Sequence, residues 1–94
     1  MPRNLSDPSL RRAKDARDLP LVEVSWVDAS STHGWFTAAE ARQEANPVPC
    51  LTIGRLVRND REVTAVAQTV SAEGKFGGLW SIPRQWVKKV RRLR

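Results

Sequence analysis

Apolar and polar residues alternate in the stretch "LVEVSWVDA" near the start of the sequence. Val22, Val24 and Trp26 occupy one phase of the alternation, and Glu23 and Ser25 occupy the other. Successive side chains of a strand point to opposite faces, so a period of two indicates a half-buried strand. The pattern predicts a strand that directs its three apolar side chains, Trp26 included, toward the core.

Two later apolar runs, "CLTIGRLVR" and "EVTAVAQTV", are separated only by "NDR". Strand-like runs joined by so short a turn indicate a β-hairpin. Gly54 lies inside the first run, where a glycine is typical of a bulge or a sharp bend. We therefore expect the first strand of the hairpin to curve.

The C-terminal part contains two more strand-like runs. The stretch "SAEGKFGG" predicts a loop and "LWSI" a strand, in which Trp80 fits either the core or the rim. Pro83 lacks the backbone N–H that a strand interior needs, so pairing should be interrupted there. After one tight turn, "WVKKVRRL" predicts a last short strand with Val87 and Val90 pointing inward.

A helix signal lies between the first strand and the hairpin. Thr37 is followed three residues later by Glu40, the spacing of a capping box. The helix should stop at Asn46-Pro47, because a residue before proline avoids the helical region. Five short strands and one short helix predict a mainly β fold, a closed or nearly closed small barrel.

The first twenty residues, "MPRNLSDPSLRRAKDARDLP", mix charges of both signs with three prolines and few apolar side chains. They offer too little apolar surface to offset the entropy lost on ordering. We expect a flexible, disordered and charged N-terminal arm at residues 1–20 and one β-barrel domain at residues 21–94. A chain of 94 residues is long enough for one modest core.

Positive charge is concentrated at the C-terminal end. The chain has 16 Lys and Arg against 10 Asp and Glu, a formal net charge of +6. Residues 84–94 contain six basic residues and no acid, so this segment carries the whole excess. A localised positive charge attracts polyanions, namely nucleic acid, nucleotides or an acidic protein face. The alternative is that the basic end serves only solubility.

The stretch "WVDASSTHGW" contains the residue types of a hydrolytic triad. Asp28, Ser30, Ser31 and His33 are crowded into one loop, whereas triad members normally converge from separated parts of a chain. Neither serine lies in a nucleophile elbow. We interpret the stretch as a loop whose Asp and Ser side chains bind its own backbone, with an unusual dihedral at Gly34. We expect no catalytic residues and no enzyme.

Cys50 and His33 are the only cysteine and histidine of the chain. A single cysteine forms no internal disulfide, and the two residues are too few for a tetrahedral zinc site. We expect no metal and no cofactor. No apolar run approaches the ~20 residues of a membrane span, and a signal peptide's apolar segment is missing. We therefore expect a cytoplasmic protein without a membrane partner.

Two tryptophans are candidates for binding a base. Trp35 lies just before the helix cap, where it either staples the helix to the barrel or offers a ring face for stacking. Trp86 lies immediately before the basic strand, whose Lys and Arg side chains suit phosphates. The predicted ligand-binding residues are Trp35, Trp86, Arg84, Lys88, Lys89, Arg91 and Arg92.

The segment "SIPRQWVKKV" resembles the end of Src-homology-3 (SH3) domains, at Ile82, Pro83, Trp86 and Val87. There a strand leads through Ile-Pro and a 3₁₀ turn with an aromatic residue into a last valine-bearing strand. The resemblance implies a five-stranded SH3-like barrel, with Pro83 and Trp86 lining a groove for proline-rich peptides. Strongly bent barrels of this size are also similar to Sm-like proteins, which form rings and bind RNA.

The wider pattern of "VEVSWVDA", "GRLV", a hairpin and "IP", over roughly residues 21–93, resembles small phage and prophage proteins of unassigned function. It implies an accessory phage protein in the bacterial host cytoplasm, a class with many inhibitors and decoys of host defence. We expect non-catalytic binding of an anionic ligand, nucleic acid or a nucleotide signal. The alternative is an SH3-like interaction module that inhibits a host defence protein. A monomer and a homo-oligomer both stay open.

Overall fold

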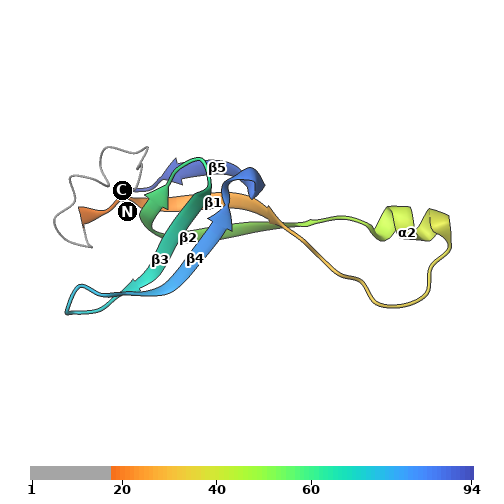
Figure 1. Ribbon diagram of the computed structural model, residues 1–94, viewed down its shortest axis with the longest axis horizontal. Helices are drawn as coiled ribbons and strands as arrows, with labels where there is room; N and C mark the ends of the chain where they lie inside the picture. Colours follow the sequence, from red (N-terminus) through yellow and green to blue (C-terminus); the bar gives the residue numbers. More distant parts are fainter. Residues whose placement is uncertain (1–17) are drawn as a thin grey trace.

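The computed structural model describes residues 18–94, which form one antiparallel sheet and a projecting helix (Figure 1). The strands are β1 (Leu21–Asp28), β2 (Val48–Asn59), β3 (Val63–Val70), β4 (Phe76–Pro83) and β5 (Val87–Arg92). Helix α2 (Ala38–Glu44) connects β1 to β2, and the 3₁₀ turn η2 (Arg84–Trp86) connects β4 to β5. In space the strands follow the order β4-β3-β2-β1-β5.

The described residues confirm a mainly β fold with five strands and one short helix. The expected closure of the barrel is not found, because β4 and β5 are the two edges of an open sheet. Strand β2 belongs to two halves of this sheet. It pairs with β1 from Val48 to Arg55 and with β3 from Arg55 to Asn59. The sheet therefore has two halves, which we call the β1/β5 half and the β3/β4 half. Strand β2 pairs with both halves and joins them.

Gly54 lies where β2 changes from one partner to the other. A Cβ added to Gly54 would lie 2.5 Å from the carbonyl oxygen of Ala67, a distance that real Cβ atoms do not show. Only glycine therefore lets the β3 backbone approach this closely. The bulge itself comes later, since the register shifts between Leu56 and Arg58. Gly54 thus indicates a close approach of β2 and β3, not a bulge. The extra residue of the bulge is Val57, which has no partner in the β2–β3 register.

Strand β4 begins earlier than expected. Gly77 pairs with Thr69 of β3, so the double glycine lies inside the strand and not in the preceding loop. Gly78 has a φ of +60°, a conformation that side-chain-bearing residues rarely adopt. The glycine-rich composition of this segment is typical of a loop, but pairing with β3 keeps both glycines in the sheet. Pro83 ends β4 as expected, and η2 follows directly.

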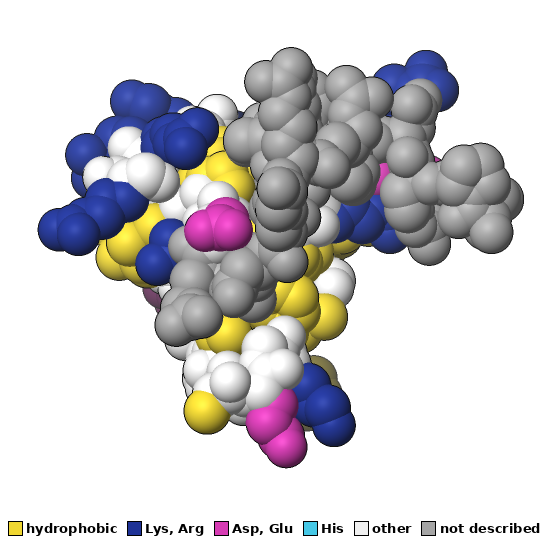
Figure 2. Space-filling model, turned by 90° about the vertical axis from the view of Figure 1, so that its left-hand side faces the viewer, with side chains coloured by type: hydrophobic (Ala, Val, Ile, Leu, Met, Phe, Trp, Pro, Cys, Tyr) yellow, Lys and Arg dark blue, Asp and Glu magenta, His cyan; other side chains and the backbone are white. Residues whose placement is uncertain are grey.

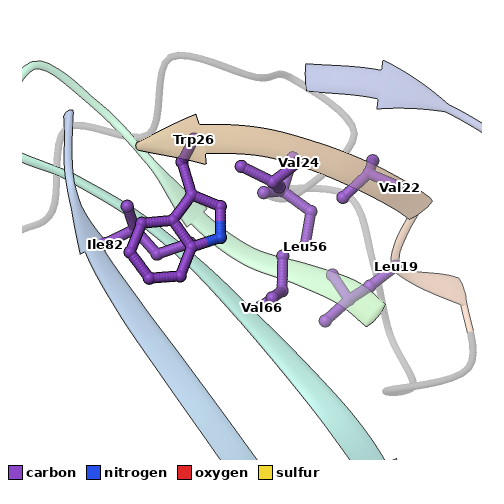
Figure 3. Packing of buried hydrophobic residues seen from close by; sticks show 7 residues of the cluster. All are labelled: Leu19, Val22, Val24, Trp26, Leu56, Val66 and Ile82. Carbon is purple, nitrogen blue, oxygen red and sulfur yellow. The ribbon is translucent and has the colours of Figure 1, made fainter. Parts of the chain in front are cut away.

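The hydrophobic core lies between the two halves of the sheet. Its buried members are Leu19, Val22, Val24, Trp26, Leu56, Val66 and Ile82 (Figure 3). The three members from β1 share one phase of the alternation, which confirms the prediction for that strand. The indole Nε1 of Trp26 donates to Thr52 Oγ1 at 2.9 Å, so its polar atom is satisfied inside the core. Val87 and Val90 pack against the cluster, as predicted.

The packed chain begins before β1. Leu19 belongs to the core, and Pro20 is fully buried. The Pro20 carbonyl accepts from the Leu56 N–H at 2.8 Å, and the Leu19 carbonyl accepts from Arg55 Nη1 at 3.0 Å. The expected boundary after Pro20 therefore falls within packed chain, because the composition of the whole segment hides its last two apolar residues. The rest of the expected arm, residues 1–17, lies outside the described residues.

The β1–β2 connection projects away from the sheet and carries α2 near its far end (Figure 1). The predicted capping box is present: Thr37 Oγ1 accepts from the Glu40 N–H at 3.2 Å, and Glu40 Oε1 accepts from the Thr37 N–H at 2.9 Å. The hydrogen bond from the Thr37 backbone, with a smaller contribution from its side chain, lowers the pKa of Glu40. None of the α2 residues is buried, so this helix adds nothing to the core.

Candidate functional site

The basic C-terminal residues lie on β5, an edge strand that pairs with β1 on one side only. Ser25 pairs with Lys89 and Trp26 pairs with Val87, which leaves Lys88 unpaired as a bulge. Bulges and lysines are two devices that keep an edge strand from pairing with another chain. The β5 edge is therefore open to solvent but poorly suited to strand addition.

All six basic residues from Arg84 to Arg94 are exposed. Arg91 Nη2 lies 3.3 Å from Glu23 Oε1, its cross-strand neighbour on β1. Within residues 18–94, no other ion pair involves this basic segment. Figure 2 views the molecule from the end that holds the C-terminus, and Lys and Arg side chains (dark blue) stand out there. One carboxylate facing so many cations leaves a positive potential along the edge.

Lys89 and Arg91 share one face of β5, the face that Ser25 and Glu23 occupy on β1. Side chains two residues apart in a strand are roughly 7 Å apart. Lys and Arg both bind phosphate, and Arg can do so through two parallel hydrogen bonds. The edge thus presents a row of cations to an extended, multiply charged ligand and does not enclose a single anion.

The structure separates the two tryptophans predicted to bind a ligand. Trp86 ends η2, directly before β5, and is 40% exposed. Trp35 is fully exposed and lies three residues before α2, in the connection that projects away from the sheet and from β5 (Figure 1). Trp35 does not staple the helix; Phe36 occupies the residue before the cap and lines a pocket together with Ala41. Only Trp86 is therefore brought together with the basic residues.

That pocket, of about 450 Å³, lies within the projecting connection. Its lining residues are Ala29, Ser30, Thr32, Phe36, Ala41, Glu44, Ala45, Asn46 and Pro47. The one charged residue among them, Glu44, is acidic. Its charge would repel an anion, so this pocket does not extend the basic edge.

The Asp28 side chain binds the loop's own backbone, as predicted, whereas the Ser30 hydroxyl binds a carbonyl outside the loop. Asp28 Oδ1 accepts from the next backbone N–H at 2.8 Å, and Ser30 Oγ donates to the Asn46 carbonyl on the opposite limb of the connection. Gly34 adopts the predicted unusual dihedral, with a φ of +133°. Within residues 18–94, no hydrogen bond joins His33 to the aspartate or to either serine. The loop therefore lacks the connected geometry of a triad.

Trp80 is a surface aromatic that the sequence did not place. It points to the inner face of β4 and is 45% exposed, with its ring centroid 6.2 Å from that of Trp26. Its Nε1 donates to Gln68 Oε1 at 3.0 Å. The sequence holds one signal for the inward orientation of Trp80: its spacing of two residues from Ile82, which is buried on the same strand.

Neither a metal-ligand cluster among the described residues nor a similarity to known proteins points to a particular ligand or reaction. No group of three or more His, Cys, Asp or Glu side chains within residues 18–94 is arranged to hold a metal ion. In the same part of the chain, no helix is long and apolar enough to cross a membrane. Compared with family models, curated proteins and solved structures, the chain matches none of them. The likenesses to phage proteins and to SH3 domains stay predictions.

Proposed function

We propose that the protein is a non-catalytic module that binds a phosphate-rich anion, nucleic acid or a nucleotide, along β5. The observation that carries this proposal is the composition of an exposed edge strand: four of the six residues of β5 are basic. Lys and Arg are the side chains that meet phosphate oxygens in such complexes. Glu23 compensates only Arg91, so Lys88, Lys89 and Arg92 are the strongest candidates for ligand contacts.

The proposed setting follows from the likeness to phage proteins: an accessory protein that binds its ligand in the cytoplasm of a bacterial host. We further propose that this open sheet is bent into a partly open barrel of the SH3-like or Sm-like kind. The shared strand β2 and the 3₁₀ turn between β4 and β5 support this assignment. A barrel of this kind would hold β5 rigidly against β1, which suits an edge that binds without catalysis.

A second candidate function has an observation of its own. Pro83 and Trp86, which the SH3 likeness places in a peptide groove, are both exposed and lie on either side of Arg84 and Gln85. An SH3-like module that binds a proline-rich segment of a host defence protein would use these two residues. Its affinity should depend little on salt, because the contacts are mainly apolar.

Salt dependence of binding tests the proposal and separates the two candidates. Fluorescence anisotropy would compare a labelled single strand of about 20 nucleotides, a duplex, a cyclic dinucleotide and a proline-rich peptide. With about three phosphate contacts to a single strand, affinity should fall roughly 20-fold between 50 and 200 mM salt, because fewer counterions are released on binding. Failure of every anion to bind at low salt would overturn the proposal, and salt-insensitive peptide binding would favour the second candidate.

A further inference from the structure

We infer that Trp80 is a stacking platform for an unpaired nucleobase, so that the basic edge binds a single strand or a free nucleotide in preference to a duplex. This inference rests on the proposed function and adds the part of the ligand that β5 cannot recognise. Trp80 lies on the inner face of β4 with nearly half of its surface exposed. Base stacking on such exposed rings is the usual way in which proteins hold single strands without reading their sequence.

Gln68 fixes the orientation of the Trp80 ring. Trp80 Nε1 donates to Gln68 Oε1 at 3.0 Å, and Gln68 Nε2 donates to the Ile53 carbonyl at 3.5 Å. The two hydrogen bonds connect the indole on β4 through β3 to β2. Since the only polar atom of the indole is already bonded, the ring offers a ligand its faces and edges and no hydrogen-bond donor. A ring whose orientation is fixed and whose N–H is already bonded is suited to stacking.

A second, buried tryptophan supports the platform from below. Trp26 is only 6% exposed, and its ring is tilted by 55° against that of Trp80 at a centroid distance of 6.2 Å. Thr52 holds Trp26 in turn through the hydrogen bond to its Nε1. Tilted aromatic pairs at this distance attract each other. Trp80 is therefore held before the ligand arrives, which lowers the ordering cost of binding.

Gly78 lies beside Gln68, the residue that orients the Trp80 ring. It precedes Trp80 by two residues on the same face of β4, and its positive φ favours glycine. A Cβ at this position would lie 3.4 Å from the Gln68 Cβ and 3.9 Å from Gln68 Oε1, the acceptor of the Trp80 hydrogen bond. A side chain at this position would thus contact the residue that orients the ring, and the positive φ would strain it.

The platform lies next to the beginning of the basic edge. Trp26, the ring beneath Trp80, pairs with Val87 at the start of β5, and Lys88 is the next residue. On the other side, Arg84 follows the end of β4, only four positions after Trp80. A ligand that stacks a base on Trp80 therefore brings its phosphates toward Arg84 and Lys88. This juxtaposition distinguishes Trp80 from Trp35, which belongs to the projecting connection between β1 and α2.

The test compares Trp80→Leu with Trp35→Leu, which makes the same chemical change at a fully exposed tryptophan. The probes are oligothymidylate, thymidine triphosphate, the matching duplex and inorganic polyphosphate, which has phosphates but no bases. We expect Trp80→Leu to weaken oligothymidylate binding about tenfold, from the loss of one stacked base, and to leave polyphosphate binding unchanged. Trp35→Leu should change neither. The triphosphate shows whether one nucleotide is enough.

Three outcomes would overturn the inference: wild-type affinity of Trp80→Leu for oligothymidylate, an equal loss for polyphosphate, or a loss confined to Trp35→Leu. If Trp80→Leu fails to fold, Gln68→Ala decides, since Gln68 is exposed; a severalfold loss for oligothymidylate alone supports the platform, and no loss overturns it. Failure of the proposed function looks different, because the wild-type protein would then bind neither polyphosphate nor oligothymidylate.

Discussion

The two edges of the sheet differ in the way they stay free of other strands. Strand β5 is basic at four of its six positions and carries a bulge at Lys88, whereas β4, "FGGLWSIP", has no charged residue. In β4, two backbone features disfavour pairing with a further strand: the positive φ of Gly78 and the missing N–H of Pro83. Charge thus protects one edge, and backbone geometry protects the other.

This difference assigns separate chemistry to the two halves of the sheet. The β1/β5 half presents cations to solvent, and the β3/β4 half presents the ring of Trp80. A phosphate-bearing strand with unpaired bases needs both, because phosphates and bases are met by different side chains. The halves are joined through β2, the core and the 3₁₀ turn η2. We therefore expect binding of one ligand by both halves to depend on the integrity of β2.

The largest effect is therefore expected from Gly54→Ala, which would break the joint between the halves. The added methyl group would meet backbone of β3, at the Ala67 carbonyl oxygen, so the strands must separate. We expect a loss of at least about 2 kcal/mol, or roughly 10 °C in Tm. Gly77→Ala is the matched control, since its methyl group would be in ordinary contact with Thr69. Equal melting temperatures of the two variants would contradict this role of Gly54.

A smaller effect, confined to the β3/β4 side, is expected at the β2–β3 turn. Asp60 accepts from Arg58 Nε at 2.6 Å and from the N–H groups of Glu62 and Val63 at 2.9 and 3.0 Å. These bonds, the one from Arg58 most strongly, hold the pKa of Asp60 at about 2. Because the folded pKa lies below the unfolded value of about 3.9, the carboxylate stabilises the fold above pH ~4, and this is lost toward pH ~2.

Thermal melts of the wild type and of Asp60→Asn between pH 2 and pH 7 measure this contribution. We expect the variant to melt lower at pH 7 and the difference to shrink as the pH falls toward the pKa of about 2. Anion binding at β5 should be unchanged at pH 7, because the turn belongs to the other half of the sheet. A melting difference that is constant with pH would show that ionisation of Asp60 is not the cause.

Local patterns predicted much of this fold. The alternation of β1, the turn between β2 and β3, and the Thr37/Glu40 capping box each depend on residues that are close in sequence. The spacing of Val87 and Val90 predicts that both point inward, and both pack against the core. The concentration of basic residues at positions 84–94 is also evident from the sequence alone. These features were predictable because neighbouring residues decide them.

Other features depend on contacts between distant parts of the chain, and the sequence did not reveal them. Gly77 belongs to β4 only because β3 pairs with it, and Leu19 is buried only because β2 lies beside it. Whether the sheet closes is decided by the relation of its two edges, not by any single strand. The same holds for the aromatic residues: composition cannot tell that Trp35 points into solvent far from β5 while Trp80 rests on Trp26.

The most direct test of the basic edge compares two triple variants that remove the same charge. One, Lys88→Gln with Lys89→Gln and Arg92→Gln, clears β5 but spares Arg91, which is paired with Glu23. The other, Arg42→Gln with Arg61→Gln and Lys75→Gln, removes three exposed cations elsewhere, so both sets lower the formal net charge of +6 by three. We measure oligothymidylate affinity at two salt concentrations, with melts to confirm folding. We predict that the β5 set loses at least about tenfold in affinity and has a flatter salt dependence, while the control set stays close to the wild type. Equal losses in both sets, or none in the β5 set, would contradict binding at this edge.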